Sequence, residues 1–242
     1  MENNFLNLTK KEIDQPIFRI IPINRLFELF SENVNILVNP KLWDDPFENF
    51  ILNSTIKFKS GIGLGIGFKE NLYGQCWTKT RESDAMWRIY SPNKNGVRIM
   101  TTPRKLLTAL FIDISPDGNY SAFIGKVKYY KTEELKKLLN KKGAEWVLDK
   151  TGKGPAQTLL FKRIAFRHEN EIRLIYNSYN KFKHDKIGFK VNAIELIDDL
   201  VFDPRINYKE FSEFKKQLIK IGFKERIVKS DLYQIPELTL EF

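Results

Sequence analysis

The chain has 242 residues, and its 42% hydrophobic and 13% aromatic content is enough to bury a core, which excludes a predominantly disordered protein. Its 40 lysines and arginines against 30 aspartates and glutamates give a net charge of +10, which favours a polyanionic partner, although a Lys-, Asn- and Ile-rich composition is also typical of AT-rich bacterial genomes. One cysteine excludes an intramolecular disulfide framework and a cysteine-based zinc site, and two histidines exclude a His-rich metal site.

The predicted elements, taken in chain order, indicate how the chain is organised. Residues 1–15 are polar and are expected to form a loosely held N-terminal arm, and residues 16–242 a single domain, because no repeat or linker divides them. Alternating apolar residues predict strands at 17–21, 35–38, 73–78, 97–101, 122–130, 169–176, 187–191 and 226–228. Helical spacing and caps predict helices at 25–32 after an Asn24 N-cap, from Ser83 to Tyr90, and at 103–111, 132–149, 155–163 and 208–221.

This order of elements is typical of an α+β fold. Strands and helices interleave irregularly, and neighbours such as 169–176 and 187–191 are expected to pair as a hairpin. We therefore predict a central, mostly antiparallel or split sheet flanked by helices. The apolar run from Leu106 to Ile112 is far shorter than the ~20 residues of a membrane span, and the N-terminus has no leader pattern, so a cytoplasmic protein without membrane contact is expected.

Two glutamates and an arginine alternate at positions 169, 171 and 173. In an extended strand these three side chains share one face, opposite the apolar Ile172 and Leu174. Carboxylates so close together repel each other unless each is paired with a cation. Without such pairing, the repulsion raises the pKa of one of them. The face is either solvated, with Arg173 bridging the acids, or lines a cleft in which one glutamate stabilises developing positive charge.

Three acids and two aromatic residues crowd the segment 43–48. Asp44 or Asp45 can cap a short helix that has a proline in its first turn and Glu48 in a capping arrangement. Capping accounts for the acids and the proline. It does not account for Trp43, which suits the wall of a pocket.

Aromatic residues also gather between Cys76 and Tyr90. Met86, Ile89 and Tyr90 recur at helical spacing, which favours a place in the core. Trp87 and Tyr90 together can stack a planar ring such as adenine or nicotinamide. Cys76 has no histidine near it in sequence, so we interpret it as a buried small hydrophobe rather than a nucleophile.

Arg19 is a single cation in an otherwise apolar strand. A buried arginine is costly unless it is paired. The side chain therefore either points outward or meets an anion or a carboxylate.

These segments, in this order, resemble the family called domain of unknown function 2971, which is found in bacteria and phages. The resemblance covers roughly residues 16 to 232 and implies no activity. It rests on the segments Asn39–Glu48, Cys76–Thr78, Met86–Tyr90, Gly96–Val97, Glu169–Arg173 and Asp203–Arg205.

A more distant resemblance is to ADP-ribosyltransferases, in the order of a strand with a central arginine, an aromatic and hydroxyl-bearing strand and helix, and a late Glu-x-Glu. It implies that NAD is the substrate, that Arg19 contacts its phosphate or ribose, and that Thr78, with Ser91 as the alternative, supports the site. It further implies that Glu171 hydrogen-bonds the nicotinamide ribose and stabilises an oxocarbenium-like state, while Glu169 serves the acceptor or positions Arg173. Breaking the glycosidic bond in this way needs no metal.

The sequence departs from that pattern after Thr78, where Lys79-Thr80 stands in place of a Ser-Thr-Ser motif, and Arg98 and Lys162 compete for the phosphate role. We nevertheless expect one concavity to hold the site. Its expected lining combines Arg19, Trp43, Asp45, Trp87 and Glu171, and Thr78 and Tyr90 complete the residues assigned to NAD.

Three functions remain open at this point. The first is an NAD-dependent ADP-ribosyltransferase-like enzyme or NAD glycohydrolase, acting as a toxin or defence effector on nucleic acid or protein and controlled by an antitoxin or another regulatory partner. The second is a metal-dependent nuclease, whose oxygen ligands would be Asp44, Asp45, Glu48, Glu169 and Glu171. The third is a non-catalytic module that binds nucleic acid or protein.

Overall fold

The computed structural model describes residues 2–43, 55–57, 63–65, 69–114, 121–179 and 184–236. Its helices are α1 (Ile23–Glu32), α2 (Asp84–Tyr90), α3 (Pro103–Ile114), α4 (Thr132–Leu148), α5 (Lys153–Thr158), α6 (Ala193–Leu196) and α7 (Tyr208–Ile221). Its strands are β1 (Phe5–Leu6), β2 (Ile17–Pro22), β3 (Val34–Val38), β4 (Thr55–Lys57), β5 (Gly63–Gly65), β6 (Leu72–Thr78), β7 (Gly96–Thr101), β8 (Ala122–Lys126), β9 (Lys128–Tyr130), β10 (Phe161–Arg163), β11 (Glu171–Asn177), β12 (Lys186–Lys190), β13 (Asp199–Phe202) and β14 (Arg226–Lys229).

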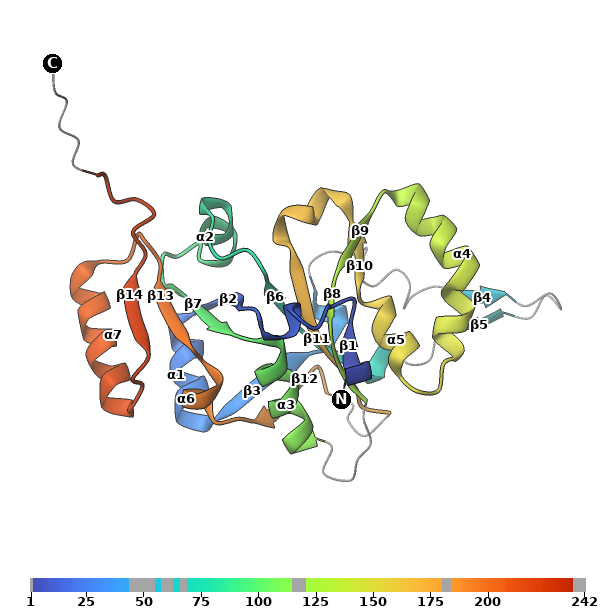
Figure 1. Ribbon diagram of the computed structural model, residues 1–242, viewed down its shortest axis with the longest axis horizontal. Coiled ribbons are helices and arrows are strands. Elements are labelled where there is room, and N and C mark those ends of the chain that lie inside the picture. Colours follow the sequence, from blue (N-terminus) through green and yellow to red (C-terminus); the bar gives the residue numbers. More distant parts are fainter. Residues whose placement is uncertain are drawn as a thin grey trace, which may run out of the picture.

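Ten strands of the described part of the chain form one mixed sheet (Figure 1). Its main path runs β1-β8-β11-β6-β2-β7-β13-β14, and β12 pairs with β3 beside it. The pairs β1–β8 and β13–β14 are parallel, and the other pairs of this sheet are antiparallel. The predicted α+β fold with a mostly antiparallel, split sheet is therefore confirmed.

The split lies along one edge of β6. On its other edge β6 pairs continuously with β11, from Thr78 opposite Glu171 to Leu72 opposite Asn177. On the split edge, β2 meets β6 only at Thr78, and β3 meets it only at Gly74. Because β2 and β3 diverge from the same strand, the sheet forks there, and the fork positions the candidate site.

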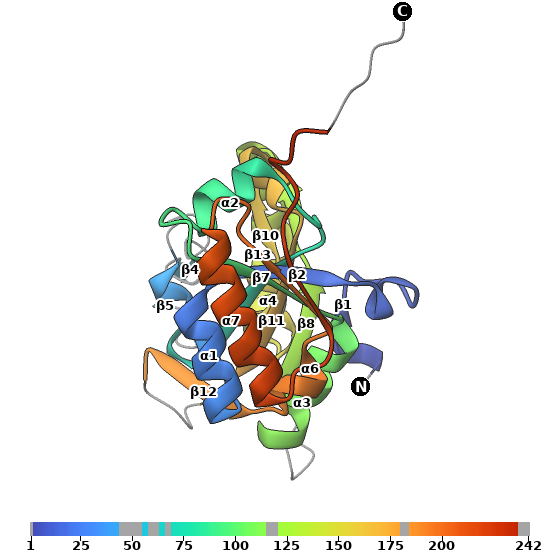
Figure 2. The same cartoon turned by 90° about the vertical axis from the view of Figure 1, so that its left-hand side faces the viewer.

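Helices cover the sheet in separate groups. The amphipathic helices α1 and α7 lie side by side (Figure 2), and the rings of Phe27 and Phe214 join them with centroids 5.8 Å apart. The main core combines apolar residues of α1, α3 and α7 with those of the sheet, and a smaller core packs α5 against β8 and β11. Helix α4 lies with the small β9–β10 sheet at the other end of the molecule (Figure 1).

Local signals explain where several helices begin and end. Ser83 Oγ accepts the Met86 amide at the start of α2, and Thr102 Oγ1 accepts the Lys105 amide at the start of α3. Helix α7 ends at Gly222, whose φ of 102° is a left-handed conformation that glycine adopts without strain. The predicted Asn24 cap is wrong, because α1 begins at Ile23 after Pro22 and has no side-chain cap.

Three other expectations also need correction. The segment 187–191 does not form a hairpin with 169–176, because β12 pairs with β3. The predicted helix 155–163 ends early, and its last residues form β10 next to β9. The N-terminal residues are attached rather than loosely held, since β1 pairs with β8 and apolar residues in this polar segment, such as Leu6, are buried against the sheet. No helix in the described ranges combines the length and the apolar character that crossing a bilayer requires.

Candidate active site

A cavity of about 600 Å³ opens where β2 and β3 diverge from β6. Its walls come from these three strands, from α2, from the 3₁₀ helix Ile164–Glu169 and from β10 and β11. The sequence assigns eight residues to NAD binding or to catalysis. Six of them line the cavity, namely Arg19, Trp43, Thr78, Tyr90, Glu169 and Glu171. Asp45 lies outside the described residues, and so do Asp44 and Glu48, the other acids of that segment.

Two glutamates of the cavity share one lysine. Lys162 Nζ donates to Glu169 Oε2 at 2.5 Å and to Glu171 Oε1 at 2.6 Å. Arg173 Nε donates to the other oxygen of Glu171, Oε2, at 2.8 Å. All four side chains are buried, with Arg173 fully inaccessible. The interpretation of this strand face as solvated is therefore wrong, and the cleft interpretation fits the geometry.

The backbone brings the two glutamates together in a way that the strand prediction missed. β11 begins only at Glu171, and Glu169 ends a 3₁₀ helix. Between them, Asn170 has a φ of 45°, a left-handed conformation that asparagine tolerates better than most residues. Thr78 Oγ1 fixes this turn by donating to the Glu169 carbonyl at 2.5 Å. Thr78 thus holds the Glu169 backbone in place, and its side-chain oxygen also accepts the Thr80 amide.

The two carboxyl groups differ in their pKa values. Burial raises the pKa of Glu169 to about 7, reinforced by its hydrogen bond with Glu171 and opposed by Lys162. Burial also acts to raise the pKa of Glu171, but Arg173, the Glu169 contact and Lys162 together hold it well below its usual range. The two carboxyls titrate as a coupled pair, in which the contacts with Arg173 and Lys162 favour the negative charge on Glu171.

Trp43 closes the cluster from one side. Its ring lies over the Arg173 guanidinium, with 4.6 Å between Cζ and the ring centroid. This position requires glycine at residue 74, because a Cβ there would lie 2.7 Å from Trp43 Cζ2. Trp43 is therefore a wall of the cavity, as its place outside the capping pattern suggested.

Arg19 projects from β2 into the same cavity and is partly exposed there. Among the residues that the structure describes, no carboxylate lies within ion-pair distance of its guanidinium. Burial lowers its pKa, while Cys76 and Tyr90 oppose that shift. A guanidinium that lines a cavity can bind an anionic group, such as a phosphate or a carboxylate, through paired hydrogen bonds.

Arg98, which competed for the same role in the sequence, is 3% exposed and donates to Asp199 Oδ2 at 2.9 Å. It is not among the residues that line the cavity. Its charge is balanced within the fold, so of these two arginines only Arg19 faces the cavity.

Helix α2 places its aromatic residues differently from the prediction. Met86, Ile89 and Tyr90, which share one side of the helix, line the cavity, and Tyr90 is 40% exposed. Burial raises the pKa of Tyr90, so its hydroxyl stays protonated. Trp87 is fully buried and is not a cavity residue, because it faces the core and its Nε1 donates to Glu82 at 2.7 Å. The assignment of Trp87 to the ligand site is therefore wrong, and so is the placement of Ile89 and Tyr90 in the core.

Sequence reasoning missed two features of the site. The sequence suggests Lys162 for a phosphate and gives no sign that it pairs with the glutamates, because its pattern predicts a helix where β10 lies. Tyr129 lies on β9, opposite Lys162 of β10, and its hydroxyl accepts the Glu171 amide at 2.9 Å. Neither contact has a local sequence signal, because each joins strands that only the tertiary fold brings together.

Fold and site together define a split-sheet α+β protein with a buried ionic cluster in its cleft. Residues 86–174 match the family described as "Protein of unknown function (DUF2971)", so the resemblance to that family is confirmed over this part of the chain. No curated protein matches the chain.

Solved structures similar to this chain include those of DarT from Thermus sp. 2.9. The complex with carba-NAD+ has 12% identity and a TM-score of 0.39, covering 90% of this chain and 96% of the other. The complex with NAD+ has 12% identity and a TM-score of 0.38, covering 89% and 94%. The complex with ADP-ribosylated ssDNA has 11% identity and a TM-score of 0.41, covering 94% and 99%.

Proposed function

We propose that the cavity binds NAD and that the protein breaks the bond between nicotinamide and ribose and transfers ADP-ribose to an acceptor in nucleic acid or protein. The observation that carries the proposal is that Arg19 and Glu171, far apart in the sequence, line the same cavity at the fork of the sheet. One is a cation without a carboxylate partner among the described residues, and the other is a buried anion.

The residues present fit the chemical parts of NAD. The pyrophosphate needs a cation such as Arg19, and the planar nicotinamide ring needs an aromatic or apolar wall, which Tyr90 and Ile89 offer. The ribose hydroxyls need an acceptor. Glu171 can serve, because a carboxylate has about four acceptor sites and can take a hydroxyl in addition to its cationic donors.

The two glutamates suit different steps. As the bond between ribose and nicotinamide breaks, nicotinamide leaves with the bonding electron pair and positive charge develops on the ribose. The ionised Glu171 carboxylate, held in place by Lys162 and Arg173, stabilises that charge without reorganising. Glu169, with a pKa of about 7, accepts the proton that the acceptor hydroxyl or amine loses as its bond to the ribose forms.

The test is incubation of the protein with NAD and cell lysate, reading free nicotinamide and mass-shifted acceptor, with and without EDTA. We expect nicotinamide release that EDTA leaves unchanged. Glu171→Gln should lower release by about 10²–10³-fold, as the loss of a preorganised electrostatic group does. Glu169→Gln should retain most of the release, because water replaces the acceptor, while modification of the acceptor falls.

The matched control is Glu213→Gln on the exposed surface of α7, which makes the same chemical change far from the cavity. It should behave like the parent. Folded Glu171→Gln protein that still consumes NAD at the parent rate contradicts the proposal. Nucleic-acid cleavage that requires a divalent metal and no NAD would instead indicate a nuclease.

A further inference from the structure

A second hollow of about 810 Å³ lies on the other side of the β9–β10 sheet from the candidate active site. We call it the α4 groove. Leu138, Lys142, Glu145, Trp146 and Asp149 line it from one face of α4 and the turn that follows, at the three- and four-residue spacing that puts side chains on one helix face. Tyr130 and Lys128 come from β9, Phe161 from β10, and Lys153 from α5.

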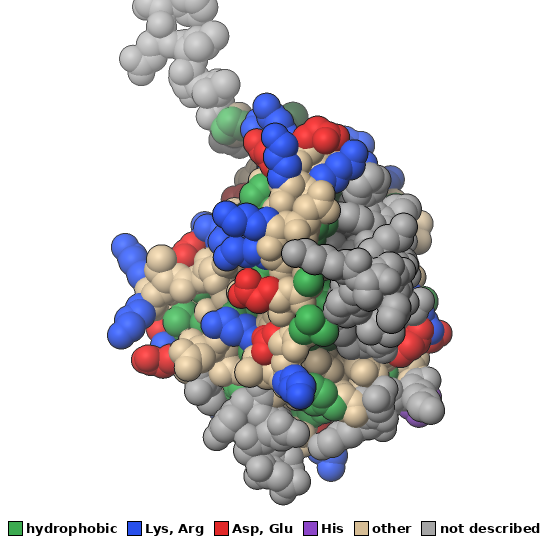
Figure 3. Space-filling view, turned by 90° about the vertical axis from the view of Figure 1, so that its right-hand side faces the viewer, with side chains coloured by type: hydrophobic (Ala, Val, Ile, Leu, Met, Phe, Trp, Pro, Cys, Tyr) green, Lys and Arg blue, Asp and Glu red, His purple; other side chains and the backbone are tan. Residues whose placement is uncertain are grey.

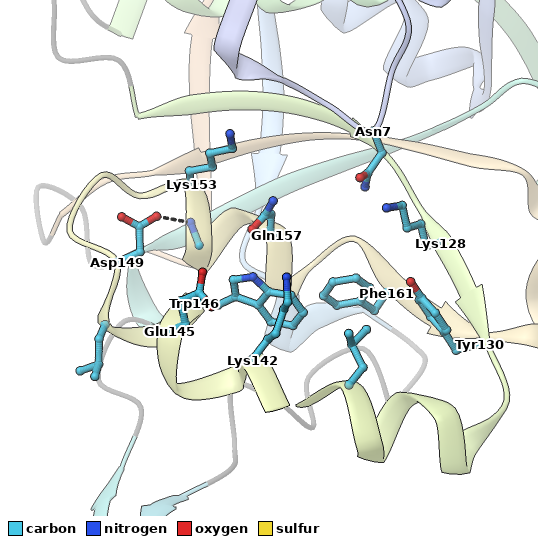
Figure 4. A pocket seen from close by; sticks show the side chains of 13 residues that line it. Asn7, Lys128, Tyr130, Lys142, Glu145, Trp146, Asp149, Lys153, Gln157 and Phe161 are labelled. Carbon is cyan, nitrogen blue, oxygen red and sulfur yellow. Dashed lines mark hydrogen bonds between the residues drawn. The ribbon is translucent and has the colours of Figure 1, made fainter. Parts of the chain in front are cut away.

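Aromatic rings form the floor of the α4 groove. The rings of Trp146 and Phe161 stack with centroids 5.0 Å apart, and Tyr130 meets Phe161 edge-on at 5.9 Å. Figure 4 shows the three rings following one another in a row. Trp146 and Tyr130 are partly exposed, so this row can extend a stack with a further planar group.

Lysines border the ring row. The ammonium groups of Lys128 and Lys142 lie beside it, and Lys153 stands further off at the edge of the groove (Figure 4); all three side chains are exposed. Within the described residues none of the three makes an ion pair. The segment 128–153 carries eight lysines and four carboxylates, and basic side chains are spread over this end of the molecule (Figure 3).

Two acids of the α4 groove offset part of this charge. Asp149 accepts the amides of Thr151 and Gly154 at 2.8 and 2.6 Å, which turns its carboxylate toward the backbone of the following turn. Glu145 is the other carboxylate in the lining. The groove thus presents flat apolar rings with three lysines and two carboxylates at their edges, a net charge of +1.

This combination selects a class of ligand. A phosphate chain matches the lysines, and unpaired bases match the rings, because every base has a face that stacks. A duplex keeps its bases stacked on each other and offers the rings nothing, and an acidic peptide offers only charge.

The α4 groove and the active-site cavity share one wall. Side chains alternate along β10, so that Phe161 lines the groove while Lys162 faces the glutamates. On β9, Tyr130 lines the groove while the Tyr129 hydroxyl accepts the Glu171 amide. A chain held in the groove is therefore close to the site where ADP-ribose would be released.

We propose that the α4 groove binds single-stranded nucleic acid, with a base stacked on Trp146 and phosphates at Lys128, Lys142 and Lys153. As the docking site of the acceptor strand, this assignment rests on the proposed function. The binding itself does not, because it requires neither NAD nor turnover.

The test measures fluorescence anisotropy of a labelled oligothymidylate of about 15 nucleotides, without NAD, between about 50 and about 200 mM salt. We expect binding that a duplex of the same length competes for weakly and polyglutamate does not. Trp146→Leu, which keeps an apolar side chain but removes the extended ring, should weaken binding about 10-fold, and Trp146→Phe should recover part of the loss. Lys142→Gln should weaken it and lower the slope of log K against log salt by about one.

Lys216→Gln on α7 is the matched control for charge, since this exposed lysine lies at the opposite end of the molecule. Lys142 is exposed as well, so its variant remains informative even if Trp146→Leu does not fold. Equal losses for Lys142→Gln and Lys216→Gln, or competition by polyglutamate as effective as by the single strand, would overturn the proposal and leave only general attraction to polyanions.

The outcomes separate this inference from the proposed function. Binding that depends on Trp146 and Lys142 in a protein that never releases nicotinamide supports the groove and refutes NAD cleavage. Nicotinamide release in a protein whose oligonucleotide binding ignores both residues refutes the groove and leaves NAD cleavage intact.

Discussion

Replacing Lys162 with methionine tests whether the ionic cluster is held by charge. The side chain keeps its length and loses the ammonium group that bridges Glu169 and Glu171 at 2.5 and 2.6 Å. At an effective dielectric constant of about 20, each of these contacts has a gross attraction of about 6 kcal/mol. The desolvation of buried ions offsets much of that attraction, and removing one partner of a buried pair has a net cost of about 3–5 kcal/mol.

The size of this effect should depend on pH. At about pH 8, above the pKa of Glu169 of about 7, Lys162→Met leaves two neighbouring carboxylates with only Arg173 to balance them. For a protein of this length, about 3–5 kcal/mol corresponds to a Tm lower by about 10 °C. At about pH 5.5, Glu169 is protonated in parent and variant, so the deficit should shrink to roughly half.

Thermal unfolding followed by circular dichroism at both pH values measures this directly. The double variant Lys162→Met/Glu169→Gln should regain part of the loss at the higher pH, because Glu171 then faces Arg173 alone. Lys216→Met on the exposed face of α7 should change stability by less than about 0.5 kcal/mol. A deficit that is the same at both pH values would refute the electrostatic reasoning and point to lost packing.

Two further predictions concern the proposed chemistry. Arg19→Ala should raise the KM for NAD about 100-fold in the nicotinamide assay. Arg19→Lys should restore only part of the affinity, because an ammonium cannot make the paired contacts of a guanidinium. An unchanged KM would contradict the phosphate role. Modification of the acceptor should rise with pH through about 7 as Glu169 loses its proton, whereas nicotinamide release to water should stay flat because Glu171 remains ionised. The folded state favours protonated Glu169, so this stabilisation is complete below the unfolded pKa of about 4.5 and about 3 kcal/mol of it is lost as pH rises through 7. Glu169→Gln cannot titrate and should therefore flatten the dependence of Tm on pH over this range.

The fold could be predicted where local patterns decide it. Alternation of apolar residues located β2 and β6, and the caps at Ser83 and Thr102 located two helices, because these signals act within a few residues. The pairing of β12 with β3 was missed. It joins strands far apart in the chain, and nothing local distinguishes that partner from the neighbouring strand in sequence.

The site could be predicted residue by residue and not as an arrangement. Arg19, Trp43 and Glu171 stood out because each breaks the pattern around it, and all three line the cavity. The hydrogen bonds from Lys162 to both glutamates could not be predicted. They require the left-handed turn at Asn170, and they require a lysine from β10, whose sequence pattern is that of a helix. Helical spacing also cannot tell which side of a helix faces the core where both sides carry apolar residues, as on the helix that carries Trp87.

The ionic cluster is itself an argument that the cavity has a chemical role. Arg173 and Glu171 are buried on β11, every residue of which is buried, in a position where apolar side chains would serve the fold. Replacing buried ion pairs with well-packed hydrophobic residues is often neutral or stabilising, by about 1–4 kcal/mol, so stability alone does not account for four charged side chains at this place. What the cluster does provide is a fixed carboxylate anion on Glu171 beside a carboxyl on Glu169 that exchanges its proton near neutral pH. Two acids driven apart in pKa within one cavity are what a reaction needs when it must stabilise positive charge in one step and remove a proton in another.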